Sequence, residues 1–213
     1  MDVSHLWLSR PVKYELVSSL LSTEWRISAG GEEIRFDLVK ANDIVYSLYP
    51  NLIADSDRVR LAPAVSVRSD LASQLYGLFF ELYGTAAGAI GSTLSELLSA
   101  RGIEFPETRW LASSEDDIKP MVARFCSDVA EFGLPFVQPY TTLSDIIEYL
   151  IQVGVDEYKR PYLAVMYAVD GRLEDALEEL RHVKLAADQE PPLVSSETNC
   201  FINNFLRHYH VEL

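Results

Sequence analysis

The sequence has 213 residues, of which 48% are apolar and 23% charged, and its 18 basic and 32 acidic residues give a formal net charge of −14. That charge disfavours nucleic acid and anionic membranes as partners and favours a basic protein. No apolar run approaches the roughly 20 residues of a membrane span. The first residues lack the basic start and long apolar core of a signal peptide, so we expect a cytoplasmic protein.

The first half of the chain is rich in strand patterns. Residues 33–39 alternate between apolar and polar side chains, which is typical of a half-buried strand in an antiparallel sheet. Residues 58–68 alternate in the same way except at Pro63, which indicates a bulge or an edge position. The other elements expected here are helices over 12–21 and 70–83, strands over 25–29, 43–49 and 108–112, a polar turn over 51–57, and a loop of small residues over 84–91.

The centre of the chain is predicted to form two helices joined by a short loop. Asp117 is expected to cap the first helix, with Pro120 in its first turn, and Gly133 is expected to end it. Thr142 and Asp145 form a T-x-x-D capping box that begins the second helix. We expect the apolar stripes of these two helices to face one another or the sheet.

Further helical signals lie on both sides of this central pair of helices. Thr93 and Glu96 form a capping box for a short helix that Gly102 ends. Helices are also expected over 161–169, 172–187 and 197–209. Strands before residue 112 and helices after it indicate an α+β fold. We expect a mixed α/β lobe over 1–112, containing a small antiparallel sheet, and a helical lobe over 113–213, packed together as one compact unit.

Three segments carry a resemblance to a known group of proteins: VRLAPAVSVR at 59–68, RWL at 109–111 and FGLPFVQPYTTLSDIIEYL at 132–150. This order of parts resembles a loosely defined bacterial family of unknown function. Some small proteins of this general sort resemble immunity proteins, the cognate inhibitors of secreted toxins. The resemblance implies a protein-binding role and supplies no catalytic residues.

The segment YLAVMYAVDGRLEDALEEL at 162–180 is similar to one tetratricopeptide helical hairpin. The positions that match the pattern are Ala164, Tyr167, Gly171, Ala176 and Leu180. Small residues allow two helices to approach closely, and glycine favours the turn between them. A tetratricopeptide array needs about three repeats and the chain shows no second copy, so an ordinary helical hairpin is the alternative.

Two acidic clusters are the candidate surfaces for a basic partner. Their residues are Glu115, Asp116 and Asp117 at a helix start, and Glu174, Asp175, Glu178 and Glu179 on a helix face. Carboxylates at a helix start also favour the helix dipole, and an acidic helix face is often merely solvated.

Four arginines form an alternative, anion-binding candidate. They are Arg35, Arg58, Arg60 and Arg68, and we expect them on the outward face of the sheet. Because Arg35 alternates with Glu33 and Asp37, ion pairs between strands also explain such a pattern.

No catalytic residue, metal site or cofactor is predicted. His208 and His210 stand two residues apart, a spacing that does not place two side chains on one side of a helix. The two cysteines, Cys126 and Cys200, have apolar neighbours and no C-x-x-C spacing. We therefore expect a non-enzymatic protein-binding module of the immunity type that acts on a basic protein. The alternative is a small-molecule-binding protein or an enzyme with a dispersed site, and the oligomeric state stays open.

Overall fold

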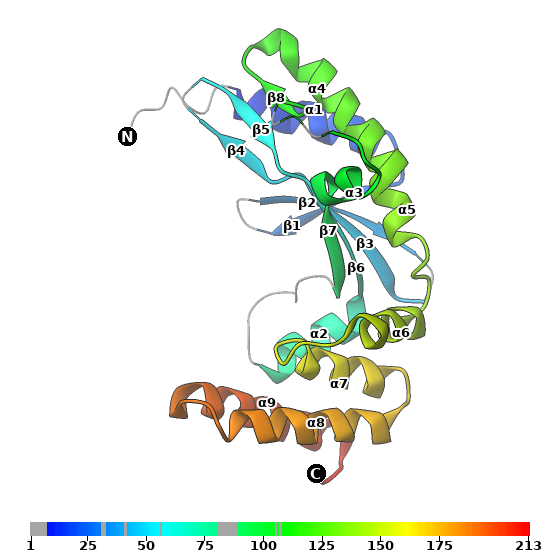
Figure 1. Cartoon of the computed structure of the whole chain (residues 1–213), viewed down its shortest axis with the longest axis vertical. Helices are drawn as coiled ribbons and strands as arrows, with labels where there is room; N and C mark the ends of the chain where they lie inside the picture. Colours follow the sequence, from blue (N-terminus) through cyan, green and yellow to red (C-terminus); the bar gives the residue numbers. More distant parts are fainter. Residues whose placement is uncertain are drawn as a thin grey trace. The chain divides into compact units, whose positions relative to one another are not determined.

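A computed structural model of the chain describes residues 8–30, 33–40, 42–55, 57–80, 89–104, 106 and 108–213. The fold is α+β, as the sequence predicts, with two antiparallel β regions and helices before and after them (Figure 1).

Contacts between residues divide the chain into two units. The first comprises Met1–Lys40, Val45–Val67 and Gly91–Pro139, and the second Ala41–Ile44, Arg68–Ile90 and Tyr140–Leu213. This division differs from the expected lobes 1–112 and 113–213. The second unit takes a helix from the strand-rich half, and the first unit keeps the helix that follows residue 113.

A five-stranded sheet has the order β1-β2-β3-β6-β7. Its strands are β1 (Arg26–Gly30), β2 (Glu33–Val39), β3 (Ile44–Tyr49), β6 (Ala64–Ser69) and β7 (Ile90–Thr93). The first three form an antiparallel meander in which Phe36 lies opposite Ile27 and Leu48. Phe36 is fully buried as its alternation predicts, but Asp37 on the opposite face is buried too. The second face of β2 is therefore also covered at this point.

A three-stranded antiparallel sheet has the order β4-β5-β8. Its strands are β4 (Leu52–Ala54), β5 (Val59–Leu61) and β8 (Leu111–Ala112). Pro63 falls between β5 and β6, so the single alternating run of the sequence is divided between two sheets. The expected turn over 51–57 is wrong for β4, because Leu52 to Ala54 pair with Leu61 to Val59. The expected loop over 84–91 lies mostly outside the described residues, and its end forms the start of β7.

The described helices of the first unit are α1 (Ser9–Leu21), α3 (Leu94–Ala100), α4 (Glu115–Asp128), the π turn η2 (Val129–Gly133) and α5 (Leu134–Val137). Two of them, α3 and α4, begin at capping boxes. The Thr93–Glu96 capping box and the left-handed Gly102 confirm the expected ends of α3. The expected cap of α4 is wrong: Ser114 is the N-cap, Asp117 is the third residue of its capping box, and Pro120 lies in the second turn.

Gly133 does not end the helix, contrary to expectation. Its φ of −70° is helical, and the chain continues through the π turn into α5. A Cβ at this position would lie 3.0 Å from Val65 Cγ1 and 3.1 Å from Leu94 Cδ2. The glycine is therefore required for close packing of the helix on β6 and α3 rather than for a turn.

The second unit is a bundle of five described helices: α2 (Asp70–Phe79), α6 (Leu143–Val153), α7 (Arg160–Val169), α8 (Leu173–Ala187) and α9 (Pro192–Tyr209) (Figure 1). The Thr142–Asp145 box begins α6 as predicted, and α9 begins five residues before the expected start. α7 and α8 form the expected hairpin, in which Ala164, Ala176 and Leu180 are fully buried and Gly171 is left-handed.

The apolar stripes of α4 and α6 were expected to face one another or the sheet, and they pack in different units. That of α4 packs on α1 and on the sheet strand β8 of the first unit, and that of α6 packs on α7 of the second unit. Their burial follows the sequence pattern, since Phe125 of α4 and Ile146 of α6 are both fully buried.

Candidate functional site

A groove of about 510 Å³ opens on the helical second unit. Its walls come from the end of α2, the segment that leads into α7, the second half of α8 and the first turns of α9. Every lining residue belongs to this unit. The volume exceeds that of any single side chain, so the groove has room for several side chains of a partner.

Three apolar side chains around the groove are open to solvent. Tyr158 is 91% exposed, Leu185 62% and Val194 45%. They come from the turn before α7, from α8 and from α9, three different segments that converge on one groove. Exposed apolar side chains that gather around a concave surface are typical of a binding site.

The turn that presents Tyr158 is fixed by local hydrogen bonds. Gly154 ends α6 with a φ of +86°, a conformation that glycine adopts without strain. The Lys159 amide then donates to Asp156, at 2.9 Å to its side chain and 3.1 Å to its carbonyl. The turn therefore holds Glu157 and Tyr158 at the surface, where both side chains are exposed.

The aromatic floor of the groove is supported from beneath. The ring of Tyr76 lies 4.9 Å from that of Phe80 and 5.2 Å from that of Tyr162, measured between centroids. Phe80 in turn stacks on Phe201 at 4.5 Å. Burial raises the pKa of Tyr76, so its phenol stays neutral. This packed aromatic cluster gives the groove a rigid apolar base.

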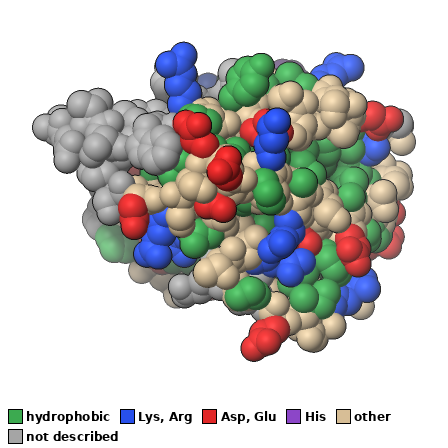
Figure 2. Space-filling view, turned by 90° about the horizontal axis from the view of Figure 1, so that it is seen from above, with side chains coloured by type: hydrophobic (Ala, Val, Ile, Leu, Met, Phe, Trp, Pro, Cys, Tyr) green, Lys and Arg blue, Asp and Glu red, His purple; other side chains and the backbone are tan. Residues whose placement is uncertain are grey.

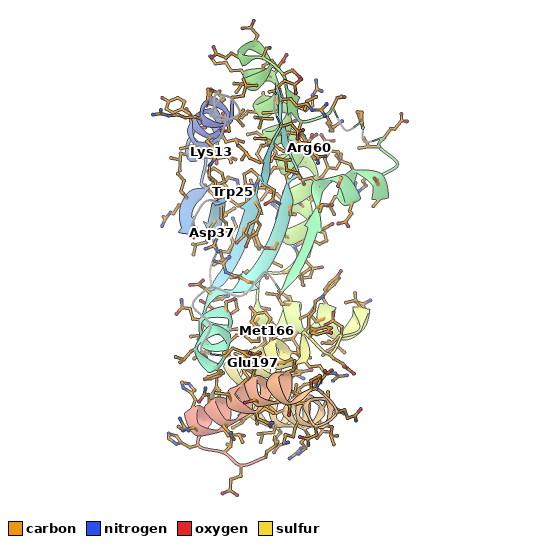
Figure 3. The ribbon with its side chains drawn as sticks, turned by 90° about the vertical axis from the view of Figure 1, so that its left-hand side faces the viewer. Lys13, Trp25, Asp37, Arg60, Met166 and Glu197 are labelled. Atoms are coloured by element: carbon orange, nitrogen blue, oxygen red, sulfur yellow. The ribbon has the colours of Figure 1, made fainter. Side chains whose placement is uncertain are left out.

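The charge that the groove offers a partner is negative. Glu157, Glu190 and Glu197 are exposed and make no ion pair within the described part of the chain. Figure 3 places Glu197 on α9, in the same helical unit as Met166 of α7. The one arginine that lines the groove, Arg160, is bound to Glu179 at 2.6 Å. Three carboxylates are therefore available for a cationic partner.

The acidic face of α8 is largely neutralised. Asp175 pairs with Arg172 at 2.7 Å, Glu178 with Arg181 at 2.7 Å, and Glu179 with Arg160. Glu174 alone of these four makes no ion pair to a described residue. The predicted surface on α8 thus retains less free charge than the sequence suggests, whereas all three carboxylates that line the groove are without an ion pair to a described residue.

The other acidic cluster, Glu115, Asp116 and Asp117, forms the first turn of α4 in the first unit. Asp117 accepts hydrogen bonds from the Ser114 hydroxyl and from the Ser113 and Ser114 amides, and these bonds, the hydroxyl first, hold its pKa below the ordinary value of 3.8. Glu115 and Asp116 remain exposed. Figure 2 shows acidic, basic and apolar side chains interspersed on the face that it draws.

The four candidate arginines do not share one face. Arg35 of β2 pairs with Asp37 at 3.2 Å, and Arg58 with Asp55 at 3.2 Å. Arg60 is exposed on β5, in the other sheet. Arg68 is only 2% exposed, which corrects the expectation that it faces outward. The structure therefore does not assemble these arginines into an anion site.

A buried polar cluster in the first unit carries no signal in the sequence. The carboxylate of Asp128 is bound by Arg109 through two hydrogen bonds of 2.6 and 2.9 Å, and by the indole N–H of Trp110 at 2.8 Å. The hydrogen bonds that Arg109 donates to Asp128 raise the pKa of Arg109. Because all three groups satisfy one another, the cluster ties β8 to the end of α4 and offers no free group for chemistry.

Metal and thiol chemistry find little support in the described ranges. No three or more His, Cys, Asp and Glu residues there are grouped to hold a metal ion. The His208 ring packs on Phe79 with 5.3 Å between centroids. Neither cysteine forms a disulfide, and burial raises the pKa of Cys126 to about 11. No described helix is long and apolar enough to cross a membrane.

Comparison with known proteins adds no relative. No protein family, curated protein or solved structure matches this chain.

Proposed function

We propose that this chain is a protein-binding module that holds a basic segment of a partner protein in the groove of its helical unit. One observation carries the proposal: three carboxylates without an ion pair to any described residue line the same groove as three exposed apolar side chains, those of Tyr158, Leu185 and Val194. The segment that fits has apolar side chains for the floor and lysine or arginine side chains for Glu157, Glu190 and Glu197. An immunity-type inhibitor in the cytoplasm, acting on a basic protein, is the biological form that the sequence resemblance suggests.

The volume of the groove also falls in the range of small-molecule sites, so a small ligand is the second candidate.

Catalysis has less support. Burial raises the pKa of the lining residue Tyr76, which its place in the aromatic floor explains without a catalytic role.

The proposal is tested with two synthetic peptides of equal length, one with leucine and lysine at helical spacing and one with leucine and glutamate. We expect the basic peptide alone to bind, with an affinity that falls as salt rises, because added salt screens exposed charges. The triple variant E157Q/E190Q/E197Q should weaken binding about tenfold or more at low salt.

The matched control is E115Q/D116N/E174Q, which also removes three negative charges but from the two acidic clusters. If both triple variants weaken binding equally, the peptide responds only to net charge and the groove is not the site. If the control alone weakens binding, the acidic clusters are the interface. The variant L185N tests the exposed apolar side chains around the groove and should reduce binding, although it changes the charge of neither the protein nor the peptide.

A further inference from the structure

A second cavity, of about 200 Å³, lies in the first unit and is independent of the groove. Two helical segments form it. Leu97, Ala100 and Arg101 come from the end of α3, and Phe132, Pro135 and Phe136 come from η2 and α5. Each set has the spacing i, i+3, i+4, which places three side chains on one side of a helix. Two such rows face a common space.

The π turn η2 explains the position of the second row of side chains, Phe132, Pro135 and Phe136. The Leu134 amide bonds to the Val129 carbonyl, five residues back, so the helix is one residue wider here. Pro135 has no N–H to donate, and a proline ring clashes with the carbonyl four residues before it in a regular helix. The wider turn accommodates the proline, and Gly133 lets this segment approach Val65 and Leu94. π turns of this kind occur often at functional sites.

Among the described residues that line the cavity, Arg101 is the one charged side chain and the others are apolar. Phe132, Phe136 and Leu97 are each only partly buried, so their apolar surface is accessible. Arg101 is exposed at the end of α3 and makes no ion pair with a described residue. A guanidinium binds a planar carboxylate through two parallel hydrogen bonds, which makes it selective for that group.

We propose that this cavity binds a small monocarboxylic acid with one apolar ring or branched chain. The ring would lie between Phe132 and Phe136, and the carboxylate would pair with Arg101. The size of the cavity limits the ligand to about one aromatic side chain, which excludes a folded partner. This site does not depend on the proposed function, because the groove lies in the other unit.

The test compares phenylacetate with phenylacetamide, which has nearly the same shape and no charge. We expect phenylacetate to bind with a dissociation constant of about 0.1–1 mM and the amide to bind at least about tenfold more weakly. Titration followed by NMR should move the ring signals of Phe132 and Phe136. R101Q should weaken binding of the acid about tenfold without affecting the amide, and R101K should restore part of the affinity.

R124Q, which removes an exposed arginine from α4 of the same unit, is the matched control and should bind the acid like the parent protein. A100F should reduce binding of both compounds by placing a ring in the cavity. Equal affinity for the acid and the amide, equal effects of R101Q and R124Q, or no binding of phenylacetate at about 10 mM would each overturn the proposal.

Discussion

At the scale of single residues, Asp128 shows how one buried charge is made compatible with the fold. Its carboxylate is 5% exposed and accepts three hydrogen bonds, two from Arg109 and one from Trp110. A charge in such a place is costly unless every acceptor site is matched. Removing the carboxylate would take away these three hydrogen bonds from Arg109 and Trp110.

Asp128→Ala should lower the free energy of unfolding by about 3–5 kcal/mol, because the Trp110 N–H stays buried and the Arg109 guanidinium loses its counter-charge. Urea unfolding followed by tryptophan fluorescence measures this loss. Asp116→Ala, an exposed carboxylate of the same helix, is the control and should change stability by less than about 0.5 kcal/mol. A loss below about 1 kcal/mol for Asp128→Ala would mean that the cluster is not the tie between β8 and α4.

At the scale of elements, the long helix from α4 through η2 to α5 departs most from what local rules predict. A glycine followed by a proline ordinarily ends a helix. Here Gly133 is helical and lies against Val65 and Leu94, so packing with β6 and α3 outweighs the local preference for termination.

Gly133→Ala tests this interpretation directly. Alanine favours a helix by about 1 kcal/mol over glycine, but its methyl group would lie 3.0–3.1 Å from two side chains that are held in the core. We expect a net loss of about 1–3 kcal/mol, as for other overpacked cores. Chemical unfolding of the parent, both single variants and the double variant with Val65→Ala measures the coupling between the two sites.

In that cycle, the alanine should cost less when Val65 has already been shortened, since the nearest contact is then removed. Gly102→Ala serves as a control for conformation alone: it has a φ of +70° and no atom near the new methyl group. Additive effects of Gly133→Ala and Val65→Ala would contradict a steric origin.

At the scale of the whole molecule, helix caps in both units make the free energy of unfolding depend on pH. Backbone and hydroxyl donors lower the pKa of Glu96 and Asp117 in the first unit and of Asp145 in the second. Because these folded pKa values lie below those of the unfolded chain, the unfolded chain binds protons more readily. The contribution of the caps is therefore present above a pH of about 4 and is lost as the pH falls through the folded pKa values.

We expect the urea midpoint to decrease as the pH falls from about 5 to 3, with a shallower decrease in the double variant D117N/D145N. Unfolding curves at constant ionic strength measure this difference. The variant D116N/D188N, which changes two exposed carboxylates outside capping boxes, is the control. An unchanged slope in D117N/D145N would show that the caps do not set the acid response.

The sequence by itself determined the secondary structure wherever a signal is local. Two capping boxes, Thr93–Glu96 and Thr142–Asp145, the left-handed glycines 102, 154 and 171, and the alternation of residues 33–39 act through neighbours within a few positions, so they can be recognised in the sequence alone. The α+β class and the α7–α8 hairpin followed from them.

Only the tertiary structure decided which elements share a unit, that Gly133 continues a helix, that Asp37 and Arg68 are buried, and that Asp128 binds Arg109 and Trp110. It also decided that most of the α8 carboxylates are paired, while those of residues 157, 190 and 197 converge on one groove. The physical reason is that burial and ion pairing depend on residues that are distant in the chain. Whether a carboxylate is ion-paired or available to a partner depends on whether the fold places a cation within about 4 Å of it.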